Sequence, residues 1–249
     1  MTISIVTVVR NRRDGVLRTI ESLAAQSYRG IQHVVIDGAS TDGTVEVLHE
    51  NRHRIAVLLS EPDKGIYDAL NKGLRLADGD VIGILHAEDV YADRLVLQRV
   101  AAELDASNSD IVFGDAEFVD PRQPDRVVRR FRSERFSPER LEWGWMPAHP
   151  AMFVRKRVFE DTGDFNATYA IAGDFEWTLR AFVGRHTTFR YIPSVLVRMT
   201  IGGVSTASWR NTIRLNQEVI RACREHNVKT SWPRLLCKYP AKLLEYIRQ

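Results

Sequence analysis

The sequence has few cysteines and no long apolar run, and both absences narrow the class of protein. Only Cys223 and Cys237 occur among the 249 residues, and they form no C-x-x-C pair. This argues against a disulfide framework or a zinc finger and favours a reducing compartment. No apolar run reaches the roughly 18 residues of a membrane span, and the apolar start at 3–9 lacks the basic segment that precedes a signal sequence. We therefore predict a cytoplasmic protein, at most attached to the inner face of the cytoplasmic membrane.

Three common catalytic motifs are also absent. No G-x-G-x-x-G follows the first apolar run, so a Rossmann nicotinamide site has no support. No G-x-x-x-x-G-K-[ST] is present, which excludes a P-loop, and the lack of G-x-S-x-G weakens a hydrolase interpretation.

The net charge of +3 is too small to indicate nucleic-acid binding. The basic character belongs to segment 229–249, which holds five Lys or Arg residues against one Glu.

Short apolar runs alternate with amphipathic segments through the first half of the chain. This alternation predicts an α/β fold, an open and mainly parallel sheet with helices on both faces. We expect strands at 3–9, 32–37, 55–60, 81–85 and 111–113, and helices that include 66–77 and 95–104. The proline-rich segment 120–150 predicts either an irregular excursion or a small antiparallel element. A helix near 176–183, a strand at 189–197 and a long helix at 211–226 follow, so we predict one domain with a C-terminal helical appendage.

Polar residues follow the predicted strands, and ligands of open parallel sheets bind at that edge. Glu88 and Asp89 come directly after a buried strand and offer oxygen ligands to Mg²⁺ or Mn²⁺, which proteins bind through one or two carboxylates plus substrate phosphates. Alternatively, the two acids begin the following helix. Asp37 ends the second strand and is placed for a ligand. Taken alone, the local pattern favours Asp174 as an N-cap and His149 as a loop histidine without a role.

Five sequence blocks occur in an order that is itself informative: SIVTVVRNR, VVIDGASTDGT, DKGIYDALNKGL, LHAEDVY and AGDFEWTLR. Together, from about residue 3 to residue 206, they resemble the inverting glycosyltransferases of family 2, which have the GT-A fold. The third block is similar to the branch that acts in bacterial exopolysaccharide, capsule and lipopolysaccharide assembly. The resemblance implies a GT-A domain over 1–206, with a nucleotide-sugar-binding half at 1–115 and an acceptor and catalytic-base half at 116–206. C-terminal helices with a basic amphipathic tail would occupy 207–249.

The resemblance also implies a role for each matching residue. Asp174 matches the general base and Asp89 the ligand of the divalent metal, Mg²⁺ or Mn²⁺. The residues that match the nucleotide-sugar donor site are Thr7, Val9, Arg10, Asp37, Lys64, Asp68, Lys72 and Glu88. On the acceptor side we place Trp143, Trp145 and His149, which lie in the irregular segment between the donor half and Asp174, although a buried aromatic cover over the sheet is the alternative. Glu176 is the fallback base.

Three positions depart from the family pattern. Gly38 stands where many relatives have a second aspartate, Val9 where an aromatic residue often stacks on the base, and Glu88-Asp89 replaces the common D-x-D or D-D pair. Because Gly38 replaces the second aspartate, the sequence does not identify the nucleobase as uracil. Because Val9 replaces the aromatic residue, another residue must stack on the nucleobase.

The resemblance implies a metal-dependent glycosyltransferase that moves a sugar from a nucleotide sugar to a glycan acceptor, one linked to polyprenyl diphosphate in surface polysaccharide synthesis. The basic tail is expected to contact an anionic membrane surface. The alternative is that it packs on the domain or on a second subunit of a homo-oligomer. The loop at 198–205, with paired glycines, is a candidate to close over the donor. Two other functions stay open: a sugar nucleotidyltransferase, whose glycine-rich N-terminal loop is absent here, and a non-catalytic nucleotide- or carbohydrate-binding module.

Overall fold

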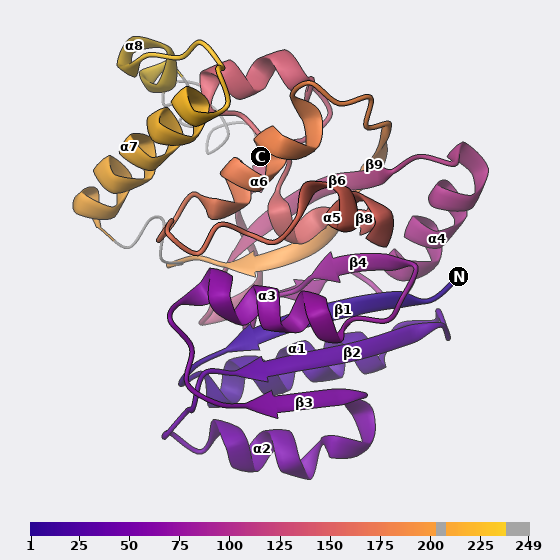
Figure 1. Cartoon of the computed structure of the whole chain (residues 1–249). Helices are drawn as coiled ribbons and strands as arrows, with labels where there is room; N and C mark the ends of the chain where they lie inside the picture. The colour runs from indigo at the N-terminus through magenta and orange to yellow at the C-terminus, as the bar shows by residue number, and fades with distance from the viewer. Residues whose placement is uncertain (203–207, 238–249) are drawn as a thin grey trace.

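The computed structural model describes residues 1–202 and 208–237, and within them nine strands form a single sheet (Figure 1). The strands are β1 Ile3–Val9, β2 Ile31–Asp37, β3 Val57–Ser60, β4 Val81–Ile84, β5 Val90–Tyr91, β6 Ile111–Asp120, β7 Gln123–Phe131, β8 Met152–Arg155 and β9 Phe189–Thr200. The helices are α1 Arg13–Ala24, α2 Thr44–Glu50, α3 Ile66–Leu76, α4 Val96–Ser107, α5 Lys156–Thr162, α6 Gly173–Phe182, α7 Trp209–Glu225 and α8 Trp232–Leu236. Short 3₁₀ turns are η1 Arg52–Arg54, η2 Pro138–Trp143 and η3 His149–Ala151.

The sheet is mainly parallel, as predicted. Its order is β3-β2-β1-β4-β8-β6-β9-β5, with β7 added alongside β6. Strands β3, β2, β1 and β4 are mutually parallel, and β9 is parallel to β6. The antiparallel strand β8 lies between β4 and β6, so those two strands run in the same direction. The carboxyl ends of β1, β2 and β3 therefore meet at one edge, on the left in Figure 1.

Helices cover both faces of the sheet because its central strands are apolar on both sides. Strand β1 is buried over its whole length. Helices α3, α5 and α6 share a core with one face, whereas α1, α2 and α4 pack on the other. Gly73 lets α3 approach β1 closely, since a Cβ there would overlap the Val6 side chain. The predicted fold class is confirmed.

The segment after β6 differs from the prediction in detail. Residues 111–131 form a hairpin of β6 and β7, which bears out the antiparallel alternative for part of 120–150. Strand β8 and helix α5 were not predicted. Both are short, and β8 is a four-residue strand that follows directly on a proline-containing turn, so neither carries a readable period.

The C-terminal helices pack against the rest of the chain. The Glu218 carboxylate of α7 accepts hydrogen bonds from the backbone N–H groups of Ala170, Ile171 and Ala172, which lead into α6. Leu235 of α8 is fully buried in the same core as α6. No helix among residues 1–202 and 208–237 is long and apolar enough to cross a bilayer. The tail 238–249 and residues 203–205 of the predicted closing loop (198–205) lie outside the described residues.

Candidate active site

The acidic turn after β4 is held by hydrogen bonds from two other elements. The Thr19 hydroxyl of α1 accepts from the Glu88 N–H at 3.1 Å and lies 2.9 Å from the Asp89 carbonyl, to which it donates. The Thr200 hydroxyl at the end of β9 donates to the Glu88 carbonyl at 3.2 Å. The helix that follows begins at Val96 with Leu95 as its N-cap, so Glu88 and Asp89 do not cap it. The capping alternative for the acidic pair is therefore wrong.

Glu88 adopts an unusual backbone conformation. Its φ is 86°, in the left-handed region that is costly for a residue with a Cβ. The side chain lies over α1, where Gly15 leaves room for it: a Cβ on Gly15 would overlap Glu88 Cγ. Arg12 forms an ion pair with the Glu88 carboxylate at 3.6 Å. The contact with Gly15 and the ion pair with Arg12 together fix the position of the Glu88 side chain.

Asp89 is a buried carboxylate beside a second acid. It is 6% exposed. Burial, and then the neighbouring charge of Glu88, raise the pKa of Asp89 to about 8. A divalent cation would relieve both penalties, so the pair fits such a metal. No three metal-ligating side chains converge among the residues the structure describes, so the other ligands would be phosphate oxygens and water.

Asp37 and Arg10 end the two neighbouring strands β2 and β1. Asp37 is fully buried, and its Oδ2 accepts hydrogen bonds from the Ser40 N–H at 3.1 Å and the Ser60 hydroxyl at 2.7 Å. Its Oδ1 is buried without a partner among the described residues. A side chain at Gly38 would overlap the Asp63 carboxylate, which occupies that space. A second acid therefore does reach this end of the sheet, but from the loop before α3.

Asp174 lies in the first turn of α6, and Ala172 is the N-cap residue. The N-cap interpretation of Asp174 is therefore wrong. Its Oδ1 accepts the Phe175 N–H at 2.8 Å and the Tyr67 hydroxyl at 3.3 Å, and neither hydrogen bond uses Oδ2. Burial raises the pKa of Asp174, and these donors oppose the shift only in part. A carboxylate with a raised pKa, and with one oxygen outside these two hydrogen bonds, is suited to act as a general base.

One histidine, His86, lies near this carboxylate, and a second, His149, lies near His86. His86 is in the turn after β4, three residues before Asp89, and His149 begins η3. Burial lowers the pKa of His149 to about 4. The pKa of His86 is also lowered to about 4, by burial and then by His149, while the charge of Asp174 acts in the opposite direction. Both imidazoles are thus neutral at physiological pH and within electrostatic reach of one another.

The side chains of the remaining donor-site candidates differ in how exposed they are. The Thr7 hydroxyl is buried and bonded to His33 Nε2 at 3.1 Å, and Val9 packs in the core beneath α1 and α2. Neither side chain is open at the sheet edge. Lys72 of α3 forms an ion pair with Glu61 at 2.8 Å, and Asp68 lies 3.8 Å from the same ammonium. Lys64 is exposed in the preceding loop, where its N–H donates to Asp68.

The acceptor-side candidates are not brought together. Glu176 is 3% exposed and faces away from Asp174, paired with Arg180 at 2.9 Å and with His226 of α7 at 2.8 Å. Trp143 is exposed at the end of η2, with the Arg234 guanidinium 5.4 Å from its ring centroid. The Trp145 ring packs against Phe131 of β7 at 6.3 Å between centroids. His149 packs edge-on against Phe165, with the ring centroids 5.6 Å apart, and it acts electrostatically on His86.

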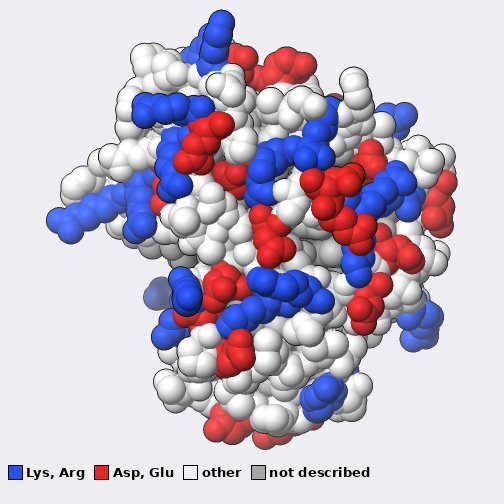
Figure 2. Space-filling view, viewed as in Figure 1, with Lys and Arg blue, Asp and Glu red and all other residues white. Residues whose placement is uncertain are grey.

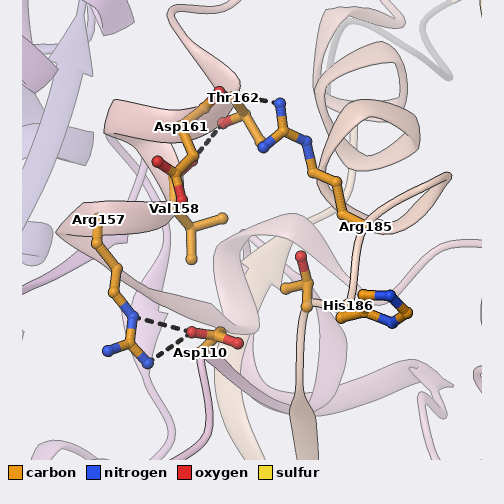
Figure 3. A pocket seen from close by; sticks show the side chains of 8 residues that line it. Asp110, Arg157, Val158, Asp161, Thr162, Arg185 and His186 are labelled. Atoms are coloured by element: carbon orange, nitrogen blue, oxygen red, sulfur yellow. Dashed lines mark hydrogen bonds and ion pairs between the residues drawn. The ribbon is translucent and has the colours of Figure 1, made fainter.

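A separate cavity of about 300 Å³ lies at the opposite end of the sheet, before β6 and β9 (Figure 3). Asp110 lies in its wall and is paired with Arg157 at 2.7 Å. No proposed site residue lines this cavity.

Acidic and basic side chains are interspersed over the face of the molecule drawn in Figure 2.

Sequence reasoning missed His86, Tyr67 and Asp63 as site residues. His86 was detectable, since it stands at a strand end in the same short block as Glu88 and Asp89. Tyr67 and Asp63 belong to the block around α3, but their contacts with positions 174 and 38 join segments far apart in the sequence.

The fold matches those of solved GT-A glycosyltransferases. The chain superimposes on Staphylococcus aureus TarS 1–349 in complex with UDP-GlcNAc with a TM-score of 0.70 at 17% identity, covering 89% of this chain and 66% of that one. It superimposes on the mannosyltransferase PcManGT from Pyrobaculum calidifontis, in complex with GDP-Man and Mn²⁺, with a TM-score of 0.67 at 19% identity, covering 90% and 63%. The chain thus spans about two thirds of the length of these solved proteins.

Sequence comparison places the chain in a family. The model for glycosyl transferase family 2 matches residues 4–163. An uncharacterized glycosyltransferase of Mycobacterium tuberculosis is 34% identical over 185 residues, 72% of this chain and 68% of the relative. A PGL/p-HBAD biosynthesis glycosyltransferase of Mycobacterium bovis is 29% identical over 195 residues, 75% and 72%. The chain belongs to glycosyl transferase family 2, a family of glycosyltransferases, and the resemblance seen in the sequence is confirmed.

Proposed function

We propose that this chain transfers a sugar from a nucleotide-sugar donor to a hydroxyl group of an acceptor by a single inverting displacement. The observation that carries the proposal is the arrangement at the end of β4. His86, in the same turn as Glu88 and Asp89, is within electrostatic reach of Asp174 on α6. One compact edge of the sheet would thus hold a carboxylate pair suited to a metal and a separate, half-buried carboxylate suited to a base.

The donor half of the reaction belongs to β1, β2 and the acidic turn. Asp37 has a buried oxygen without a partner among the described residues, which suits a hydrogen-bond donor group of the nucleoside, and Arg10 lies beside the adjacent Gly38. Asp89, with Glu88, would hold Mg²⁺ or Mn²⁺, and the bound ion would neutralise the diphosphate. Lys64, Asp68 and Lys72 line the approach from α3. Thr7 and Val9 contribute from beneath, as parts of the strand that supports the site.

The chemical step needs one proton acceptor and one leaving group. Asp174 Oδ2 accepts the proton of the acceptor hydroxyl as that oxygen forms a bond to the anomeric carbon of the donor sugar. The bond from the anomeric carbon to the diphosphate oxygen breaks at the same time, and the nucleoside diphosphate leaves with the electron pair. Because attack comes from the face opposite the leaving group, the anomeric configuration inverts. Tyr67 and the Phe175 N–H hold Oδ1, so that Oδ2 faces the reaction.

We also propose a glycan acceptor carried on a lipid, as in bacterial surface polysaccharide synthesis. The basic segment that follows α8 would hold the enzyme at an anionic membrane surface, each Lys or Arg near the lipid contributing about 1 kcal/mol. Trp232 and Leu236 of α8 are 42% and 52% exposed, and Trp143 lies near them with Arg234 over its ring. Exposed tryptophans beside basic residues are typical of interfacial contacts. A homo-oligomer through this surface is the competing proposal.

Removing the tail tests the membrane proposal. The cut belongs after Cys237, because Leu235 is part of the core and a shorter chain would lose α8. The truncated protein is expected to keep its melting temperature and its turnover of soluble substrates but no longer to sediment with anionic vesicles. Replacing Lys238, Lys242 and Arg248 by Ser in the full chain is the matched control. Sedimentation of both variants like the wild type would contradict the proposal.

A panel of nucleotide sugars with Mn²⁺ tests the function itself. We expect one or two of them to raise the melting temperature and to be turned over, with release of nucleoside diphosphate that EDTA stops. A sugar nucleotidyltransferase would instead release pyrophosphate from a nucleoside triphosphate and a sugar phosphate. A binding module would show the thermal shift without turnover. Either result would replace the proposed function.

A further inference from the structure

His86 carries a ring nitrogen that nothing in the described chain satisfies. Its Nδ1 is buried without a hydrogen-bond partner among residues 1–202 and 208–237. A buried polar atom left unpaired costs about 1–3 kcal/mol, so such atoms usually meet a ligand or a neighbour. The residue follows β4, and the Asp89 N–H donates to its carbonyl at 3.0 Å, which fixes its backbone in the acidic turn.

The surroundings of this imidazole indicate what would satisfy it. His149 and Asp174 are its charged or titratable neighbours, and they come from η3 and α6. Asp174 Oδ1 is already engaged by Tyr67 and Phe175. A neutral imidazole presents one donor and one acceptor, and a sugar hydroxyl does the same. A hydroxyl beside Asp174 would therefore complement both the free carboxylate oxygen and the histidine.

We propose that His86 is a substrate-binding residue that hydrogen bonds a sugar hydroxyl next to Asp174; this rests on the proposed function and adds a residue to it. The hydroxyl belongs either to the donor sugar or to the acceptor, and the two sources share the same chemistry. In both cases His86 would connect the proposed metal site with the proposed base. Its backbone belongs to the turn that holds Glu88 and Asp89, and its side chain lies near Asp174.

The test replaces His86 by Leu, which fills similar space without a polar atom, and by Gln, which restores a donor and an acceptor. His53, exposed in η1 on the far side of β3, is replaced by Leu as the matched control. For His86→Leu we expect an unchanged or higher melting temperature, unchanged binding of the nucleoside diphosphate with Mn²⁺, and a loss of about 5- to 100-fold in kcat/KM. His86→Gln should recover part of the loss, and His53→Leu should behave as the wild type.

Two further readouts assign the hydroxyl. If it belongs to the donor sugar, His86→Leu weakens binding of the nucleotide sugar and slows its hydrolysis without acceptor. If it belongs to the acceptor, hydrolysis is unchanged and the acceptor KM rises. Wild-type kinetics in a folded His86→Leu protein would overturn the assignment, as would a proportional loss of nucleoside diphosphate binding. If the Leu variant does not fold, full activity of His86→Ala or no recovery by His86→Gln overturns it equally. Absence of any turnover by the wild type would instead overturn the proposed function.

Discussion

Replacing Asp89 by Asn is expected to stabilise the metal-free protein while abolishing its activity. The pKa of Asp89 is raised from 3.8 to about 8. Between these two pH values the unfolded chain has lost the proton and the folded chain still holds it. Folding therefore takes up a proton, and the free energy of unfolding falls as the pH rises across this window. Asn cannot ionise and escapes that loss.

The pKa shift sets the upper limit of the effect. Four pKa units at about 1.36 kcal/mol each correspond to roughly 5 kcal/mol at pH 8, and to about 1–2 kcal/mol at pH 5. Relaxation around a buried charge reduces such values, so we expect a gain of about 1–3 kcal/mol at pH 8, or a melting temperature higher by about 3–10 °C. The advantage of the Asn variant should grow steadily from pH 5 to pH 8.

The assay is thermal unfolding of both proteins in EDTA at pH 5, 6, 7 and 8, repeated at pH 8 with Mn²⁺ and a nucleoside diphosphate. The wild type should gain stability from metal and nucleotide, and Asp89→Asn should not. Asp93→Asn is a control in which the opposite effect is expected. The side chain of Arg99 lowers the pKa of Asp93, so losing the Asp93 carboxylate should destabilise the protein. A lower melting temperature for Asp89→Asn at pH 8 in EDTA, or an equal response to Mn²⁺, would refute the reasoning.

Two further substitutions separate the roles of neighbouring groups. Gly15→Ala should displace Glu88 and weaken Mn²⁺-dependent binding of the nucleoside diphosphate by about 10-fold, with a small change in melting temperature. An unchanged affinity in isothermal titration calorimetry would count against a role for Glu88 in this binding. Glu176→Gln should lower stability by about 2–4 kcal/mol, since it leaves the Arg180 guanidinium without its buried partner, while donor KM stays constant in the folded protein. If Glu176→Gln instead lowered kcat while its unfolding in denaturant stayed as in the wild type, Glu176 would be a catalytic residue.

The first half of the fold was predictable because its strands are short runs rich in apolar residues that alternate with amphipathic helices. Strands β1 and β4 are buried on both faces, and the helix after Lys64 has a clear amphipathic pattern. The four residues of β8 carry no such signal, and its place between β4 and β6 depends on pairing with segments far away in the sequence.

The candidate site was predictable where its chemistry is local. Glu88 and Asp89 stand together in the sequence, and so they could be assigned to one site before the structure. Glu176 shows the limit of such reasoning. Its spacing from Asp174 suggested a second base, but its orientation depends on His226, fifty residues further along the chain. His86 went unassigned because its role depends on what faces it from α6 and η3.

The anomeric configuration of the product tests the central claim most directly. Proton NMR of a reaction with the donor found in the nucleotide-sugar panel should show a single product whose anomeric configuration is opposite to that of the donor. Asp174→Asn should form it about 10²- to 10⁴-fold more slowly, with unchanged donor affinity. A product with retained configuration, or an Asp174→Asn protein that works at the wild-type rate, would contradict the account.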